Sequence, residues 1–373
     1  MAWQFARTPE AAAETCFPRD YAAARQQFLD LAKHAHLPVM TYGNPNKGPA
    51  GEPLGTDAAL QGPTDAKALL VTISATHGVE GFCGSGAQAD WLTAAAGASL
   101  PPGVAILHLH AINPHGFAWL RRVTEEGVDL NRNFVDFGKP LPENSAYDLL
   151  ADAFVPRSLD PGVVATGEAR IKAYREQHGD RGLQSARSGG QYKHPSGIFF
   201  GGTKSTWSRQ TLERVIGDYD LKSRARVAVI DYHTGLGPYG YGELICDHDP
   251  GSPNLALAEA WFGESVTVPL LGTSASVPKH GTAGVDFWQK HLGPRVVYNA
   301  LEFGTFSPER GRGPMREDHV LHARGPVDWA DPETQRIKRN LRRHFYPDTR
   351  PWRELVLFRS RQVLTQAIAG LTE

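Results

Sequence analysis

The sequence has few cysteines and no long apolar run. Its three cysteines, Cys16, Cys83 and Cys246, have no paired spacing, which argues against a disulfide framework and against a cysteine-ligated zinc site. No stretch approaches the roughly 18 apolar residues that a membrane-spanning helix needs. Residues 1–15 lack the apolar core of a signal peptide. We therefore expect a cytoplasmic protein.

The sequence also lacks an excess of positive or negative charge. The net charge is −1, from 39 Lys and Arg against 40 Asp and Glu, so no field draws the chain to nucleic acid or to a membrane. One basic stretch has the spacing of a solvated helix face. It comprises Arg336, Lys338, Arg339, Arg342 and Arg343. No heptad or strand-edge signal predicts the oligomeric state.

Apolar runs and helical patterns alternate along the chain. Runs at 67–76, 104–112, 226–232 and 295–303 are typical of buried strands, and helical patterns lie at 20–35, about 86–95, 333 to about 344 and 351 to about 371. This alternation predicts an α/β fold with a mixed central sheet covered by helices. We expect a single elaborated domain over residues 1–373, with an insertion at about 135–205.

Polar side chains follow the ends of three predicted strands. His77, His233 and Glu302 are far apart in sequence, but each lies at the end of an apolar run. Because ligands of such sheets bind just beyond the carboxyl ends of the strands, we expect these three side chains to converge.

His77 and Glu80 stand three residues apart in a tight turn, and His233 supplies a third candidate metal ligand. A catalytic zinc takes about three such ligands and keeps an open position for water. The alternative for His233 is a strand-end histidine bonded to the backbone. Ligand histidines usually donate their second nitrogen to a carboxylate, for which Asp129 is a candidate behind His77 and Asp231 a weaker one behind His233.

Other histidines are weaker candidates for ligands. His108 and His110 share one strand face without a nearby acid, so we expect them to be buried. Asp247-His248-Asp249 precedes a segment rich in Pro and Gly and is expected to form a solvated loop. A two-metal site is a minor alternative that uses the spare histidines.

Asn131 and Arg132 place an amide and a guanidinium side by side. This pair is well suited to hold a substrate carboxylate. The alternative is a helix cap and a surface residue. With the candidate metal site, the pair indicates a hydrolase for substrates that end in an acid.

The order of motifs resembles the zinc carboxypeptidase (M14 peptidase) superfamily. The motifs are HGVE (77–80), NPHG (113–116) followed by two arginines, DLNRNF (129–134), DYHTG (231–235) and LEFG (301–304). The tracts NRNFVDF (131–137) and GQYKHPSGIFFGG (190–202) resemble the bacterial DUF2817 group within that superfamily. The resemblance covers roughly residues 15–325. It implies a zinc carboxypeptidase-like (phosphorylase/hydrolase-like) sandwich fold.

The resemblance also implies a metal centre. One zinc ion per chain would be held by His77, Glu80 and His233, with Asp129 behind His77. Glu302 would be the general base that activates the metal-bound water and passes the proton to the leaving nitrogen.

Substrate contacts follow from the same resemblance. Arg122, rather than its neighbour in sequence, matches the arginine that polarises the scissile carbonyl. Asn131 and Arg132 match the pair that binds the terminal carboxylate. A capping tyrosine has no motif here, and Tyr239 and Tyr241 are the candidates. The chain departs from the family pattern at His115, where an aspartate is usual.

These features predict a zinc hydrolase that cleaves an amide bond next to a free carboxylate in a small peptide. The alternative is a deacylase of N-acyl amino acids, of the aspartoacylase and succinylglutamate desuccinylase type, which shares the His-x-x-Glu and DLNR motifs. A third hypothesis is a non-catalytic binding protein with the same fold. The insertion and the tract 190–202 are expected to wall a narrow pocket.

Overall fold

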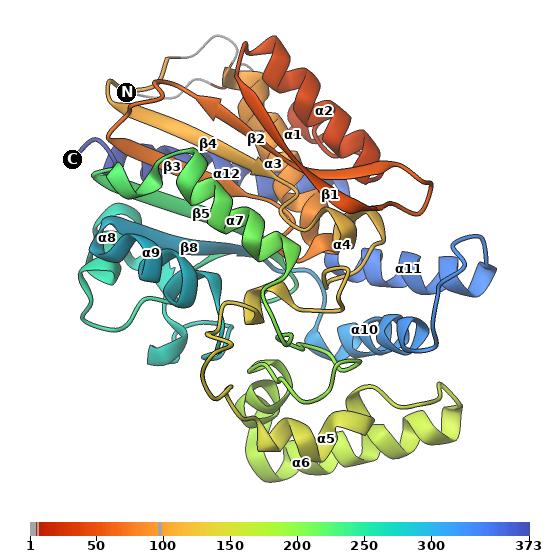
Figure 1. The fold of residues 1–373 in the computed structure, drawn as a ribbon. Helices are drawn as coiled ribbons and strands as arrows, with labels where there is room; N and C mark the ends of the chain where they lie inside the picture. Colours follow the sequence, from red (N-terminus) through yellow and green to blue (C-terminus); the bar gives the residue numbers. More distant parts are fainter. Residues whose placement is uncertain (1–4, 6, 96–98) are drawn as a thin grey trace.

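The computed structural model describes residues 5, 7–95 and 99–373 (Figure 1). These residues form an eight-stranded sheet in the order β1-β2-β4-β3-β5-β8-β6-β7. The strands are β1 (Val39–Lys47), β2 (Pro53–Gln61), β3 (Ala68–Ile73), β4 (Val104–His110), β5 (Arg226–Thr234), β6 (Gly242–Ile245), β7 (Val266–Thr267) and β8 (Val296–Phe303).

The centre of the sheet is parallel and its flanks are antiparallel. Strands β4, β3, β5 and β8 run in one direction. Strand β2 pairs antiparallel with both β4 and β1, and β6 pairs antiparallel with β8. The predicted mixed sheet of an α/β fold is confirmed.

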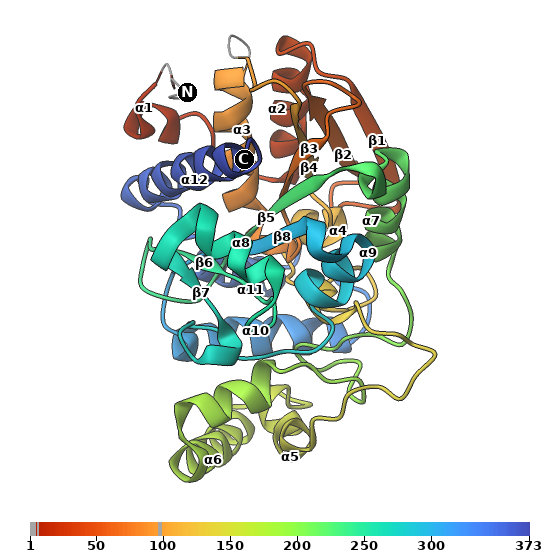
Figure 2. The ribbon, with the colours of Figure 1, turned by 90° about the vertical axis from the view of Figure 1, so that its left-hand side faces the viewer.

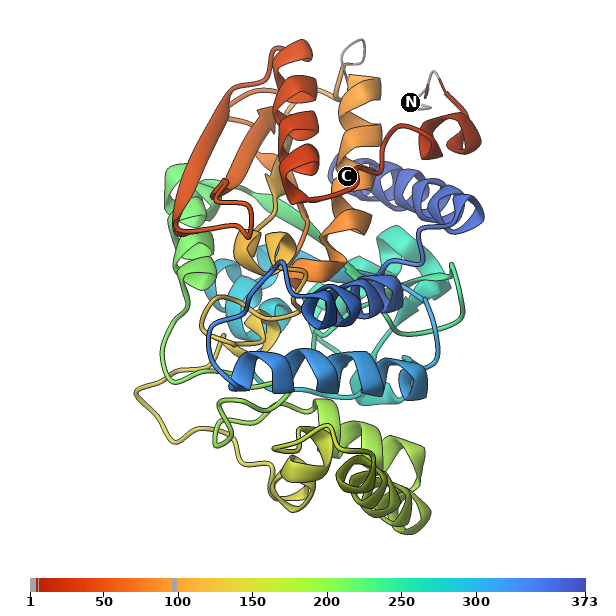
Figure 3. The same cartoon turned by 90° about the vertical axis from the view of Figure 1, so that its right-hand side faces the viewer.

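Helices cover both faces of the sheet (Figures 2 and 3). Alternate residues of β3 enter two different apolar cores, with Leu70 in the core that includes α3 and α12, and Leu69 and Val71 in the core that includes α7. Two-sided burial explains why the central strands are continuous apolar runs.

The helices are α1 (Pro9–Ala13), α2 (Tyr21–His34), α3 (Gly81–Ala95), α4 (Pro114–Ala118), α5 (Ser145–Phe154), α6 (Pro161–Ser188), α7 (Trp207–Asp218), α8 (Pro253–Phe262), α9 (Lys290–Leu292), α10 (Pro308–Ala323), α11 (Pro332–Phe345) and α12 (Arg350–Gly370), and a π-helix spans Gly284–Gln289.

Helices α5 and α6 lie at one end of the molecule, away from the sheet (Figures 1 and 2). They share a smaller apolar cluster with α10, in which Tyr147 and Ile171 pack with Met315. Helix α6 is interrupted at Gly179, whose φ of 72° breaks the regular helix. The segment predicted as an insertion, at about 135–205, contains these two helices.

Two groups that the sequence places in solvent are buried. His248 has no exposed surface, because its ring accepts a hydrogen bond from the Tyr298 N–H at 3.0 Å and contacts Gln289 at 2.7 Å. Lys338 is 1% exposed and donates to Asp318 at 2.5 Å. The predictions of a solvated loop and of a wholly solvated basic face are thus wrong at these two positions.

His108 and His110 are fully buried, as predicted, and contact the hydroxyls of Thr72 and Ser85 at 2.9 and 3.0 Å. Within the described ranges, no helix combines the length and the apolar character that crossing a bilayer requires.

Candidate metal centre

The turn after β3 brings His77 and Glu80 to one side of the chain. A short 3-10 turn at Gly78–Glu80 places the Glu80 N–H on the His77 carbonyl at 3.0 Å. Gly78 lies so close to α4 that an added Cβ would stand 2.0 Å from the Gly116 carbonyl carbon. Only glycine fits this approach, so the turn is fixed against the segment that leads to Arg122.

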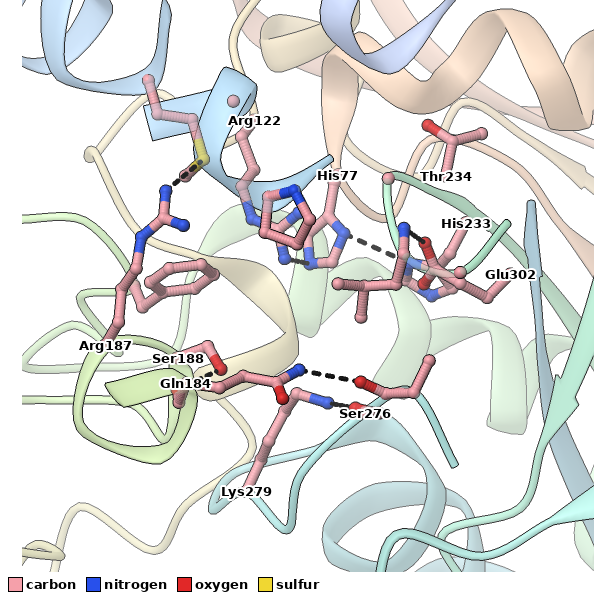
Figure 4. Close-up of a pocket in the computed structure, with 18 of the residues that line it drawn as sticks. His77, Arg122, Gln184, Arg187, Ser188, His233, Thr234, Ser276, Lys279 and Glu302 are labelled. Atoms are coloured by element: carbon pink, nitrogen blue, oxygen red, sulfur yellow. Dashed lines mark hydrogen bonds between the residues drawn. The ribbon is translucent and has the colours of Figure 1, made fainter. Parts of the chain in front are cut away.

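His233 reaches the same point from the end of β5. One donor atom of each of His77, Glu80 and His233 lies within 4.8 Å of the others. Figure 4 shows the two imidazoles beside Glu302. Each imidazole Nδ1 faces the Glu80 carboxylate, at 3.1 Å from His77 and 3.4 Å from His233. All three side chains are buried. The predicted ligand set therefore converges.

Carboxylates stand behind both imidazoles. His77 Nε2 lies 3.1 Å from Asp129 Oδ1, and His233 Nε2 lies 3.1 Å from Asp231 Oδ2. A proton on Nε2 beside a carboxylate leaves the Nδ1 lone pair free for a metal. Asp231, the weaker prediction from the sequence, thus lies as close to its imidazole as Asp129 does, although only the Asp129 contact has hydrogen-bond geometry.

Glu302 lies beside His233 on the neighbouring strand, because the two residues are register partners in the β5–β8 pair. Its Oε1 accepts a hydrogen bond from the Leu236 N–H at 3.0 Å. Burial, with the charge of nearby Glu80, raises the pKa of Glu302 to about 7. Burial opposes a proton on His233, but the charges of Asp231 and Glu80 raise its pKa well above the usual value.

These residues fit zinc. Two imidazole nitrogens and one carboxylate are a ligand set that catalytic zinc commonly takes. The centre also buries several carboxylates close together, namely Glu80, Asp129, Asp231 and Glu302. A bound dication would offset their mutual repulsion and favour ionised carboxylates and neutral imidazoles.

Arg122 faces the cavity and its neighbour does not. The guanidinium of Arg122 donates to Glu80 at 2.6 Å and to Asp129 at 3.0 Å, and it also lies 2.8 Å from His77 Nε2. Arg121 instead donates to Asp318 of α10 at 3.0 Å. The choice of Arg122 from the sequence agrees with this geometry.

Asn131 and Arg132 line the same cavity. The Asp129 side chain accepts from the Asn131 N–H at 3.0 Å and so starts the turn that carries both residues. Arg132 is 1% exposed and donates to the carbonyls of Ser188 and Asn131, at 2.6 and 2.7 Å. Backbone oxygens thus already occupy part of the donor capacity that a substrate carboxylate would use.

The structure does not bring Tyr239 and Tyr241 to the cavity. They are 44% and 50% exposed, and the Tyr239 hydroxyl lies 2.6 Å from Thr349 Oγ1. Neither tyrosine is among the residues that line the cavity. The predicted substrate contacts of these two tyrosines are therefore wrong for this geometry.

The cavity has a volume of about 340 Å³, and distant segments build its walls. Arg187 and Ser188 of α6 line it together with Phe199, which confirms that the insertion and the tract 190–202 wall the pocket. Gln184 of α6 donates to the Ala275 carbonyl at 2.8 Å and so joins α6 to the loop at 272–282.

Lys279 and Arg187, which the sequence analysis did not identify, place two cations in the cavity (Figure 4). His344 of α11 is a third wall residue that it missed. No motif spacing marks these three positions, because only the folded chain brings them together.

Residues 17–359 match the model of a family described as a protein of unknown function, DUF2817. The chain belongs to the DUF2817 family. Comparison of this DUF2817 protein with curated proteins gives no significant sequence match.

Solved structures that resemble this DUF2817 protein include two carboxypeptidases and an amidase. The first is carboxypeptidase A from Helicoverpa armigera (14% identity, 95% of this chain and 75% of that chain covered, TM-score 0.49). The others are murein-tripeptide amidase from Escherichia coli O157 (14%, 78% and 92%, 0.33) and a metallo-carboxypeptidase from Pseudomonas aeruginosa (13%, 90% and 69%, 0.36). At such identities and TM-scores, the likeness says nothing of this chain's substrate or metal.

Proposed function

We propose that this DUF2817 protein is a zinc-dependent hydrolase that cleaves an amide bond next to a free carboxylate. The observation that supports this proposal most is the convergence of His77, Glu80 and His233 beside Glu302 in one cavity. Zinc held by these three residues would polarise the amide carbonyl and lower the pKa of a bound water towards about 7.

Glu302 is the general base in this proposal. Its Oε1 is occupied by the Leu236 N–H, so Oε2 can accept a proton from the attacking water. Glu302 then gives that proton to the nitrogen of the leaving group as the carbon–nitrogen bond breaks.

Arg122 stabilises the oxygen of the scissile carbonyl as negative charge develops there. Asn131, Arg132 and Lys279 line the part of the cavity that we assign to the free carboxylate. Lys279 Nζ donates a hydrogen bond to Ser276, and it has no ion-pair partner among the described residues. An unpaired ammonium is therefore available to the substrate at this wall.

The size of the cavity favours small substrates. A volume of about 340 Å³ lies at the lower end of the range for ligand pockets. A dipeptide and an N-acyl amino acid both suit it. A panel that contains both classes separates a carboxypeptidase from a deacylase.

Glu302→Gln tests the proposed base. We expect this variant to lose at least about 100-fold in kcat while it keeps its zinc, since only proton transfer is removed. Glu259→Gln, at an exposed position of α8, is the matched control and should keep full activity. Full activity of Glu302→Gln would refute the base assignment. Failure of the zinc-loaded wild type to cleave any member of the panel would refute the amide hydrolase.

A further inference from the structure

Arg187, near the carboxyl end of α6, presents a guanidinium to the cavity and has no acidic partner among residues 5, 7–95 and 99–373. Among the described residues its hydrogen-bonding partner is the Met315 sulfur, at 3.6 Å. Its Nε is shielded from solvent and makes no hydrogen bond. A guanidinium has five N–H donors, and a charge that is withdrawn from water without a counter-charge is destabilising. The arrangement therefore points to an anionic ligand.

Neighbouring arginines of the same helix show that acids are available in this segment. Arg170 pairs with Asp152 at 2.8 Å, and Arg175 pairs with Asp180 at 2.5 Å. Arg175 and Asp180 also line the cavity, as a pair, whereas Arg187 lines it and lacks such a pair within the described part of the chain. Its side chain is thus not explained by the packing of α6.

Two further groups with unmet hydrogen-bonding capacity line the cavity. Arg312 of α10 lies 3.4 Å from Glu168, but its Nε is shielded and has no hydrogen-bond partner in the described part of the chain. His344 of α11 is buried, and its Nδ1 likewise has none among the described residues. Burial, and then the charge of Arg312, lowers the pKa of Arg187 to about 10, as expected where cations gather without an anion.

An aromatic side chain ties Arg187 to the proposed catalytic site. The Phe199 ring lies 5.1 Å from the guanidinium carbon of Arg122, 5.3 Å from that of Arg132 and 6.0 Å from that of Arg187. Phe199 has a φ of 56°, which is unfavourable for a bulky residue and fixes the ring at this point. One aromatic ring thus contacts three cations around the same cavity.

The cations stand on separate walls of the cavity. Arg187 projects from α6 and Lys279 from the loop at 272–282, with Arg122 and His77 above them in the view of Figure 4. Lys279 belongs to the wall where the proposed function puts the free carboxylate. Because Arg187 projects from a different segment of the chain, we assign it to a different part of the same substrate.

We propose that Arg187, with Arg312 and His344, forms a second anion-binding subsite, so that the substrate carries a carboxylate on each side of the scissile amide. The assignment of the reacting bond rests on the proposed function, whereas the second anion subsite does not. The substrate class is an amino acid whose nitrogen bears a dicarboxylic or otherwise acidic acyl group.

Binding of simple diacids tests the subsite without any hydrolysis. Dicarboxylic acids from glutarate to suberate are titrated calorimetrically into the full-length protein as purified, each against the monocarboxylic acid of the same carbon count. We expect at least one diacid to bind about tenfold more tightly than its monoacid, as a charged hydrogen-bonded contact provides. No preference for any diacid would overturn the subsite.

Variants of Arg187 assign that preference to one residue. Arg187→Gln should reduce it to about twofold or less, whereas Arg187→Lys should keep part of it. Arg181→Gln, an exposed arginine of the same helix that does not line the cavity, should keep all of it. A full preference in a folded Arg187→Gln variant would overturn the proposal.

Hydrolysis of N-succinyl-alanine and N-butanoyl-alanine separates the two proposals. A higher kcat/KM for the succinyl substrate that is lost in Arg187→Gln would support both the hydrolase and the anion subsite. Diacid binding without hydrolysis would defeat only the proposed function, and hydrolysis without acid preference would defeat only the subsite.

Discussion

Lys279 is a cation whose charge depends on pH in the range where enzymes are assayed. Burial lowers its pKa to about 8, and repulsion by Arg132 acts in the same direction. The amine is therefore charged below about pH 8 and neutral above it. If Lys279 binds the substrate carboxylate, KM should rise as the pH increases through this value.

Steady-state kinetics between about pH 6 and 9.5 checks this expectation. Lys279→Arg keeps its charge over the range, so the KM of this variant should stay low at the alkaline end. Lys279→Met should have a high KM at every pH. Identical profiles of wild type and Lys279→Met would contradict the assigned contact.

In the proposed zinc centre, Asp231 would act on the metal through His233. Its carboxylate lies 3.1 Å from His233 Nε2 and accepts hydrogen bonds from Thr76 and Tyr298, at 2.8 and 3.1 Å. Asp231→Asn keeps the size of the side chain and removes its charge. We expect the affinity for zinc to fall about 10- to 100-fold, measured by competition with a chromophoric chelator. Asp218→Asn is the control, because Asp218 accepts a hydrogen bond from Tyr42 and does not line the cavity. Equal zinc affinities of Asp231→Asn and the wild type would contradict the role of Asp231.

At the scale of elements, Asp318 joins α10 to α11 and to the segment that carries Arg122. It is 1% exposed and pairs with Arg121 at 3.0 Å and with Lys338 at 2.5 Å. Burial opposes its ionisation, but the two cations lower its pKa well below the usual range. The pairs therefore stabilise the fold above the pKa of an unfolded aspartate, about 4, and this stability is lost as the pH falls further.

Asp318→Ala leaves two buried cations without a partner. We expect the free energy of unfolding to fall by about 3–5 kcal/mol at neutral pH, measured by urea denaturation. Asp249→Ala, at an exposed position, should change it by less than about 0.5 kcal/mol. If Asp318→Ala lowered the free energy of unfolding as little as the control does, the cluster would not hold the helices together.

The sequence predicts elements well where both faces are buried. Strands β3, β4, β5 and β8 are continuous apolar runs because helices cover both sides of the sheet. Strand β1 is largely exposed and β7 has two residues, so neither has an apolar signal. Helix α6 was not predicted, since its apolar residues are few and it is interrupted at Gly179.

The same contrast holds for the site. His77, Glu80 and Asp129 stand in short motifs whose local turns determine their geometry, so the sequence was sufficient. Arg187 and Lys279 enter the cavity only because α6 and the loop at 272–282 meet beside the carboxyl ends of β5 and β8. Spacing cannot reveal contacts that depend on such distant segments.

For the whole molecule, the buried acids at the centre couple metal binding to stability. Zinc that binds the folded chain and not the unfolded one should increase the free energy of unfolding by about 2.7 kcal/mol when free zinc is at 100 times its Kd. The Tm should rise accordingly. A chelator should reverse this rise in scanning calorimetry. His77→Ala should show no response to zinc, and a response equal to that of wild type would contradict the site.

The most direct test of a zinc centre at His77, Glu80 and His233 is the metal content of the protein purified without chelators, measured by elemental analysis. We expect close to one zinc ion per chain in the wild type, and little in His77→Ala and His233→Ala, because each variant removes one of the three ligands. A wild type without zinc, or an unchanged zinc content in both variants, would contradict the metal centre and the hydrolase built on it.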